Sequence, residues 1–147
     1  MSGTVHVAVG IVADPTGAIL ITRRPDHVHQ GGRWEFPGGK VEATESVEAA
    51  LHRELHEELG IVVQAAEPWL QIRHAYSDKT VLLDVWQVTV WHGEPHGREG
   101  QPLRWVTPAR LADFAFPAAD EPIVAGLRLE HAQIAQQASS KGISDAR

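Results

Sequence analysis

The chain has 147 residues, of which 43% are hydrophobic and 22% are charged, a composition typical of one globular domain. The net charge of -6 argues against broad binding to nucleic acid or to an anionic membrane, and the absence of cysteine excludes disulfides, thiolate metal sites and cysteine nucleophiles. No apolar run approaches the roughly 20 residues that a membrane helix needs. We therefore expect a cytoplasmic enzyme or binding protein, acting as a monomer or homodimer.

The N-terminal third is expected to contain strands and a loop. A β-branched run over residues 5–12 and an apolar run over 18–22 flank a turn at 14–17, which predicts a β-hairpin. The polar segment 23–33 predicts a loop, and residues 34–36 form a short extended piece that leads into a glycine-rich stretch.

Residues 45–59 are expected to form a helix. They contain no proline or glycine, and their aliphatic residues recur every four positions, at Val47, Leu51, Leu55 and Leu59. Thr44 or Ser46 can cap the start of this helix, and Gly60 stands where a glycine commonly ends one.

The next part of the chain is expected to be mostly strand. The sequence predicts strands over 70–74, 81–91 and 103–106, with a turn at 77–78 and a glycine-rich loop over 92–101.

Helices are expected at the C-terminal end. Thr107 followed by Pro108 predicts the start of a short helix through Phe114, and a last helix is expected over 123–136. The small polar residues 139–147 predict a flexible tail after a single domain over 1–138. Because strands and helices are mixed without strict alternation, we expect an α/β or α+β sandwich.

Three carboxylates lie on one face of the predicted helix. Glu54, Glu57 and Glu58 stand at positions i, i+3 and i+4, and this face adjoins the leucine stripe. A solvated acidic surface is one interpretation of this pattern. The other is a site for a hard cation such as Mg²⁺, which binds one or two carboxylates together with substrate phosphates.

The residues around these carboxylates form a longer motif. Its nine specified positions, spaced as G-x5-E-x7-R-E-U-x-E-E-x-G-U with U a bulky aliphatic residue, are Gly39, Glu45, Arg53, Glu54, Leu55, Glu57, Glu58, Gly60 and Ile61. This is the Nudix box, so the chain resembles the Nudix hydrolases. Segments 22–25, 32–40, 93–102 and 116–122 are similar to the MutT type of that superfamily.

The resemblance implies a fold and a reaction. The fold is the Nudix α/β/α sandwich, with a mixed β-sheet between helices. The reaction is Mg²⁺-dependent hydrolysis of a nucleoside triphosphate to the monophosphate and pyrophosphate, with Mn²⁺ as a substitute cation. For the MutT type, the implied substrate is an oxidised guanine nucleotide, notably 8-oxo-dGTP.

The resemblance also implies residues for the chemistry. Glu54, Glu57 and Glu58 would bind the metal together with the Gly38 carbonyl. Glu99 would bind metal or deprotonate water, and Glu54 also has a claim to the role of base. Arg53 would orient Glu57 by an ion pair, and Glu45 would brace the junction between loop and helix.

Further residues are expected to contact the nucleotide. Arg24, Lys40 and Arg23 could face the phosphates, although each could also be an ordinary surface cation. His29 lies in a loop where MutT-type proteins often place a histidine near the nucleotide. Phe36 and Tyr76 could stack on the base or belong to the core, and Tyr76 and Lys79 stand where the type tends to have Phe and Arg.

Asp120 stands where the MutT type has an asparagine that helps to select the base. An ionised aspartate only accepts hydrogen bonds, so it could bind the N1-H and N2-H of guanine or the N4-H of cytosine, or cap a helix. CTP or a modified dCTP is therefore an alternative substrate. Dinucleoside polyphosphates and a non-catalytic role as a nucleotide sensor are more remote alternatives.

Overall fold

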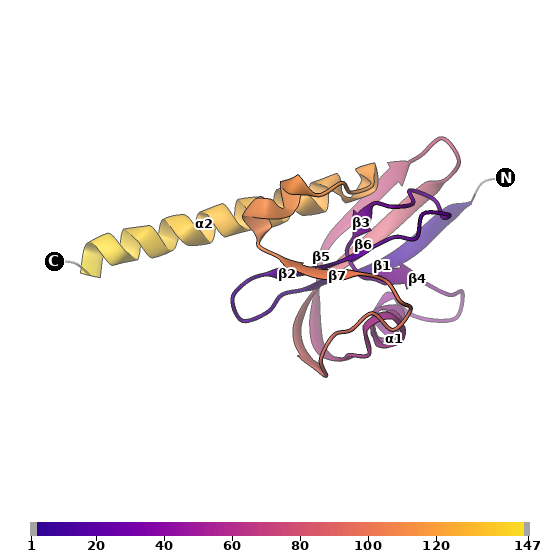
Figure 1. Cartoon of the computed structure of the whole chain (residues 1–147), viewed down its shortest axis with the longest axis horizontal. Coiled ribbons are helices and arrows are strands. Elements are labelled where there is room, and N and C mark those ends of the chain that lie inside the picture. The colour runs from indigo at the N-terminus through magenta and orange to yellow at the C-terminus, as the bar shows by residue number, and fades with distance from the viewer. Residues whose placement is uncertain (1–2, 146–147) are drawn as a thin grey trace.

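The computed structural model describes residues 3–145, with the side chains of residues 3–137. Strands lie between two helices, α1 (Val47–Leu59) and α2 (Glu121–Asp145), as Figure 1 shows. One sheet contains β1 (Thr4–Val12), β4 (Gly38–Lys40), β5 (Val62–Ala75) and β6 (Thr80–His92). The other contains β2 (Ile19–Arg23), β3 (Trp34–Glu35) and β7 (Leu103–Val106). The expected mixed sheet between helices is confirmed, with the second sheet as an addition.

The larger sheet has the strand order β4-β1-β6-β5 and is mixed. Strand β1 runs parallel to β6 and antiparallel to β4, while β5 and β6 pair antiparallel along most of their length. The smaller sheet, in the order β3-β2-β7, is antiparallel.

The predicted hairpin between β1 and β2 is wrong. The turn itself is present, because the Asp14 carboxylate accepts the backbone N–H groups of Thr16 and Ala18, each at 2.9 Å. The two strands meet only at an isolated bridge between Ala13 and Ile19, and then enter different sheets. The turn therefore moves the chain from one sheet to the other.

Both faces of β1 are buried, which explains its continuous apolar sequence. Val9 and Ile11 pack into a core shared with the second sheet and with Ile123 of α2. Ala8 and Val12 pack on the opposite face into a core that includes the leucines of α1. The helices thus cover opposite faces of the larger sheet.

Helix α1 has the position and the burial that its periodicity predicts. Ser46 caps it by accepting the Ala49 N–H at 3.1 Å, and the helix ends at Gly60, which is left-handed. Leu51, Leu55 and Leu59 are fully buried. Their burial turns the adjoining carboxylate face toward the edge of the sheet.

Two strands differ from their predicted form. Strand β5 begins at Val62 instead of residue 70, and it tolerates Pro68 because it is an edge strand with irregular register nearby. Strand β4 is formed by the glycine-rich stretch, for which the sequence gives no strand pattern.

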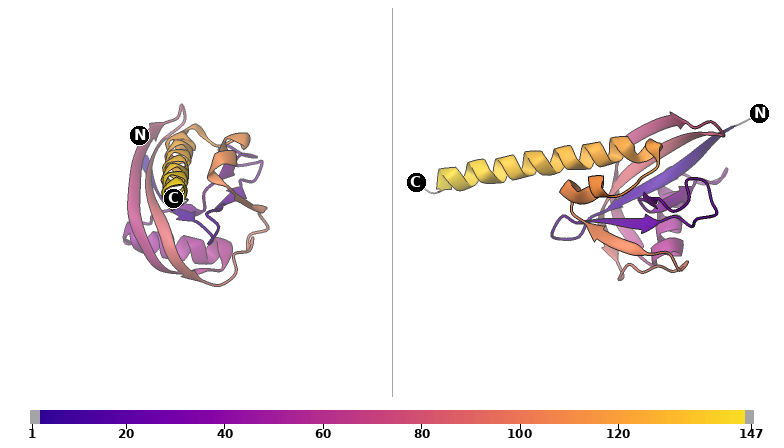
Figure 2. Two further views of the ribbon diagram at one scale, coloured as in Figure 1. Left: turned by 90° about the vertical axis from the view of Figure 1, so that its left-hand side faces the viewer. Right: turned by 45° about the horizontal axis from the view of Figure 1, so that its top comes forward.

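The C-terminal part is more helical than expected. A 3-10 helix, η1 (Pro108–Asp113), replaces the short α-helix, and a 3-10 turn, η2 (Ala118–Asp120), leads directly into α2. Figure 2 shows α2 end-on in one view and projecting away from the sheets in the other. The backbone is helical to Asp145, so α2 includes most of the predicted tail, whose flexibility remains a prediction; residues 146 and 147 lie outside the described part.

Within the described residues, no helix combines the length and the apolar character needed to cross a membrane.

Candidate active site

Two glycines form a floor on which the carboxylates of α1 can lie. Gly38 and Gly39 of β4 pair with Val9 and Ala8 of β1. At Gly38, where φ is 154°, an added Cβ would lie 2.0 Å from the Ala8 carbonyl oxygen. At Gly39 it would lie 2.2 Å from the Glu54 carboxyl carbon. Any side chain here would displace either the strand or Glu54.

Glu58 is fixed to this floor by a hydrogen bond. Its Oε2 accepts the Gly38 N–H at 2.9 Å. The pKa of Glu58 is raised to about 8, chiefly by burial and also by the charges of Glu35, Glu54 and Glu99, while the Gly38 hydrogen bond acts in the opposite direction. The carboxylate therefore lies among like charges, and no cationic side chain of residues 3–137 forms an ion pair with it.

Arg53 contacts several groups beside the carboxylate cluster, by which we mean Glu54, Glu57 and Glu58. Its guanidinium donates to Glu45 at 2.5 Å, to Glu54 at 2.8 Å and to the Lys40 carbonyl at 3.0 Å. The expected pair with Glu57 is present but longer, at 3.4 Å. Arg53 thus contacts Glu54 and Glu45 more closely than Glu57, and Glu45 also accepts the Glu42 N–H at 2.9 Å just before the helix.

Glu54 keeps an acidic environment despite this arginine. Burial raises the pKa of Glu54, and the hydrogen bond and charge of Arg53 lower it, while Glu57 and Glu99 raise it again. The Glu57 side chain is 53% exposed, so it points to solvent beside the cluster.

The glycine-rich loop after β6 brings Glu99 beside the same cluster. The Arg98 N–H and the Gln101 Nε2 both donate to the Glu58 carbonyl, each at 3.0 Å. Gln101 in turn accepts the Glu99 N–H at 2.9 Å. The loop therefore satisfies the last carbonyls of α1 while holding an exposed carboxylate within electrostatic range of Glu54 and Glu58.

The donor set fits a hard divalent cation that substrate helps to bind. Among the described residues, no three His, Asp or Glu side chains already converge as a complete metal cage. Mg²⁺ needs only one or two carboxylates if phosphate oxygens and water supply the rest. Glu54 and Glu58 are half-buried, and their pKa values are raised first by burial and also by neighbouring carboxylates, whose repulsion a cation would relieve.

A cleft of about 240 Å³ begins at the glycine floor. Its lining includes residues that the sequence assigned to metal or phosphate binding and residues that it assigned to the rest of the nucleotide. The first group is Gly38, Lys40 and Glu58, and the second is Arg24, His29, Phe36, Tyr76, Lys79 and Asp120. The structure therefore brings the predicted nucleotide-contacting residues together. Arg23 is instead exposed and pairs with Asp26 at 3.1 Å.

Arg24 and Phe36 line the cleft, and both also make contacts with other residues of the protein. The Arg24 guanidinium pairs with Glu35 at 2.6 Å and also donates to the His29 carbonyl at 2.8 Å. The Phe36 ring is 4% exposed and stacks on Phe116, with ring centroids 5.1 Å apart. Phe36 is thus mainly a core residue that forms a wall of the cleft.

Glu35 is a site residue that the sequence analysis missed. Burial raises the pKa of Glu35, whereas its partner Arg24 lowers it. The Glu35 charge in turn raises the pKa of Glu58 and of Asp120, so this carboxylate is electrostatically linked to both ends of the cleft. The signal in the sequence was an acidic residue between two aromatic residues in a predicted extended segment.

Asp120 lies at the other end of the cleft and is 8% exposed. Its pKa is raised to about 7, chiefly by burial and also by the charge of Glu35, while Arg24 acts in the opposite direction. Within residues 3–137 its carboxylate accepts no hydrogen bond, so nothing there supports the helix-cap interpretation. The carboxyl group is thus open to a ligand.

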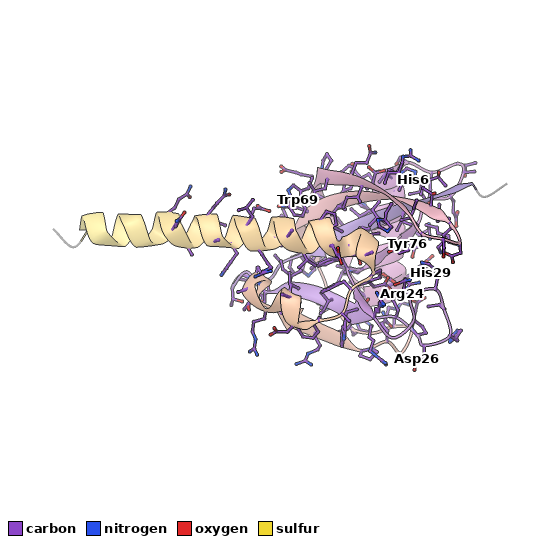
Figure 3. All side chains as sticks on the ribbon, turned by 90° about the horizontal axis from the view of Figure 1, so that it is seen from above. His6, Arg24, Asp26, His29, Trp69 and Tyr76 are labelled. Atoms are coloured by element: carbon purple, nitrogen blue, oxygen red, sulfur yellow. The ribbon has the colours of Figure 1, made fainter. Side chains whose placement is uncertain are left out.

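Tyr76 and His29 stand beside Asp120. The Tyr76 hydroxyl accepts the Ala119 N–H at 2.9 Å, and the His29 ring meets the Tyr76 ring edge-on. His29 Nδ1 contacts Asp78 at 3.0 Å, whereas its Nε2 is buried without a partner in the described part of the chain. Figure 3 shows Tyr76, His29 and Arg24 close to the start of α2.

A family model described as "NUDIX domain" matches residues 8–126. An 8-oxo-dGTP diphosphatase of Escherichia coli is 41% identical over 123 residues, which cover 84% of this chain and 95% of that protein. A CTP pyrophosphohydrolase of the same organism is 37% identical over 79% of this chain and 86% of that protein.

Solved structures agree with these sequence matches. One from a study of MutT from Aliivibrio salmonicida and Vibrio cholerae is 43% identical, with a TM-score of 0.76, and the match covers 87% of this chain and 99% of the solved one. The E. coli ORF135 protein is 34% identical, with a TM-score of 0.78, covering 90% and 94% of the two chains.

Proposed function

Because this chain belongs to the Nudix family, we propose that it is a Mg²⁺-dependent pyrophosphohydrolase of nucleoside triphosphates, with an oxidised purine nucleotide such as 8-oxo-dGTP as its substrate. Similarity to 8-oxo-dGTP diphosphatases over most of the chain supports this substrate. One observation carries the proposal: the carboxylates of Glu54 and Glu58 lie at the glycine floor of the cleft that Asp120 also lines.

Members of this family typically depend on a divalent metal. We assign its binding to Glu54, Glu57, Glu58 and Glu99 and the Gly38 carbonyl, with Mn²⁺ as a substitute for Mg²⁺. When bound, such a cation offsets negative charge on phosphate oxygens and lowers the pKa of water. The positions of Glu58 on the Gly38 N–H and of Glu54 beside Gly39 support this assignment, because these carboxylates lie among like charges that a cation would offset.

The chain's own residues then position the reactants. In the reaction, a water oxygen bonds to phosphorus as the bridging bond between the α- and β-phosphates breaks, which gives the monophosphate and pyrophosphate. Glu54 or Glu99 accepts the proton of that water, and Arg53 keeps Glu54 in place through the 2.8 Å hydrogen bond. Lys40, at the mouth of the cleft, binds phosphate by its charge.

Asp120 recognises the base in this proposal. As a neutral acid it can donate one hydrogen bond and accept others, and as an anion it only accepts. A pKa of about 7 makes both forms available near neutral pH. The surrounding walls of the cleft are formed by His29, Phe36, Tyr76 and Lys79. Arg24 also lines the cleft, where its ion pair with Glu35 holds it.

A cytosine nucleotide is the second candidate substrate. The ionised Asp120 carboxylate suits the N4 amino group of cytosine, which donates hydrogen bonds. The similarity to a CTP pyrophosphohydrolase supports the same candidate.

A substrate panel tests the proposal. Pyrophosphate release from 8-oxo-dGTP, dGTP, CTP, 5-methyl-dCTP and a diadenosine polyphosphate is compared by kcat/KM, with and without Mg²⁺. We expect Mg²⁺-dependent release with the highest kcat/KM for 8-oxo-dGTP. A preference for the cytosine nucleotides would favour the second candidate, and no release from any nucleotide would refute both.

A further inference from the structure

The ring of Tyr76, the chain's one tyrosine, is fixed at the end of β5. The rings of His29 and His74 form T-shaped pairs with it, with centroid distances of 4.8 and 4.5 Å and interplanar angles of 78° and 61°. Its backbone N–H donates to the Lys79 carbonyl at 2.7 Å. The phenol oxygen therefore has a defined position next to the cleft, as Figure 3 indicates for the ring beside the start of α2.

That oxygen holds the turn that carries Asp120. The Ala119 N–H donates to Tyr76 Oη at 2.9 Å, and the Asp120 N–H donates to the Pro117 carbonyl at 2.9 Å. On the other side, α2 anchors the turn through Ile123, which is fully buried. Asp120 is thus placed between a strand-end side chain and the first turn of a helix.

The Tyr76 hydroxyl keeps its proton in the folded protein. Burial and the nearby Asp120 carboxylate raise the pKa of Tyr76, so the phenol stays protonated at neutral pH. The hydroxyl oxygen therefore accepts the Ala119 N–H as part of a neutral phenol.

We propose, on the basis of the proposed nucleotide hydrolysis, that Tyr76 is a positioning residue for base selection, because its hydroxyl fixes the 118–120 turn that presents Asp120 to the cleft. Without the hydroxyl, the Ala119 N–H loses its partner and the turn gains freedom. Asp120 would then meet different bases with a less defined geometry, and discrimination between them would fall.

Tyr76→Phe tests this, because it removes the hydroxyl and keeps the ring. Binding of 8-oxo-dGMP, dGMP and CMP is measured by calorimetry without metal, so the result does not depend on turnover. We expect the ratio between the weakest and the tightest dissociation constant to fall by about 3- to 10-fold. Thr89→Val is the matched control, because it removes a hydroxyl that bonds a backbone carbonyl, at 3.1 Å, outside the cleft lining.

A second background separates positioning from general stability. In Asp120→Ala, the hydroxyl has no carboxylate to position, so Tyr76→Phe should leave the ratio unchanged there. An unchanged ratio in Tyr76→Phe alone, or an equal fall in both backgrounds, would overturn the inference. So would a wild type that binds the three monophosphates equally or not at all. A wild type that discriminates in binding but releases no pyrophosphate would refute the proposed function alone.

Discussion

The Glu58 carboxylate accepts the Gly38 N–H at 2.9 Å, which joins the last turn of α1 to the edge strand β4. This contact links the two parts of the Nudix box, the glycine-rich strand at its start and the carboxylate helix at its end. The strand gives a backbone surface without side chains, and the helix places carboxylates on it. The result is a half-buried acidic surface at one end of the cleft.

Gly39→Ala should misplace Glu54, because the new Cβ would lie 2.2 Å from the Glu54 carboxyl carbon. We expect kcat/KM for the best substrate to fall by about 100-fold, the size of effect that a displacement near 1 Å can cause. Gly3→Ala is the control, since an added Cβ there has no atom within 4 Å. Equal activity in the two variants would contradict the role given to the glycine floor.

Arg53→Lys should weaken the site while keeping the positive charge. A lysine cannot supply the planar fork that contacts Glu45, Glu54 and the Lys40 carbonyl together. We expect a fall in kcat/KM of about 10-fold, as for residues that orient metal ligands. Arg110→Lys, at an exposed pair with Asp113, should leave activity unchanged. Wild-type activity in Arg53→Lys would show that charge alone suffices.

Asp120 should make stability depend on pH. Its folded-state pKa of about 7 lies above the unfolded value of about 3.9, so the folded chain binds the proton more tightly. The resulting stabilisation is complete below the unfolded pKa and is lost as the pH rises through 7. The free energy of unfolding of Asp120→Asn, relative to that of the wild type, should therefore rise by a few kcal/mol between pH 5 and pH 9. Thermal unfolding of both proteins measures this difference, and parallel pH curves would rule it out.

Glu35→Gln should shift that pH dependence downward. Removing the Glu35 charge takes away one cause of the raised Asp120 pKa and leaves Arg24 to lower it. The free energy of unfolding is compared between Glu35→Gln and the double variant that also carries Asp120→Asn. We expect the pH midpoint of this difference to fall below 7. Glu121→Gln removes an exposed charge next to Asp120 that does not contribute to its pKa, so it should not move the midpoint. Equal midpoints for the two variants would disprove the link.

Local signals in the sequence predicted α1 well. Its leucines repeat at helical spacing, Ser46 and Gly60 mark its ends, and these features act within a few residues of one another. The Nudix box likewise located the carboxylate cluster, because the helix period alone brings Glu54, Glu57 and Glu58 to one face.

Pairings between distant segments could not be predicted in the same way. The turn at Asp14 was recognised, but no local pattern says that β1 pairs with β6 instead of β2. The glycine-rich β4 has no side-chain alternation. In β5, Pro68 argued against a strand, so the first half of this strand was not predicted. Glu35 was missed because its importance comes from Arg24 and Asp120, which only the fold brings near.

The position of a bound cation tests the central claim most directly. Crystals soaked with Mn²⁺ and a nonhydrolysable nucleoside triphosphate analogue would locate the metal by its anomalous scattering. We predict a peak between the Glu54, Glu57 and Glu58 carboxylates and the nucleotide phosphates, beside the Gly38 carbonyl. Phosphates bound in the cleft with no metal at these carboxylates, or a metal held elsewhere, would contradict the account.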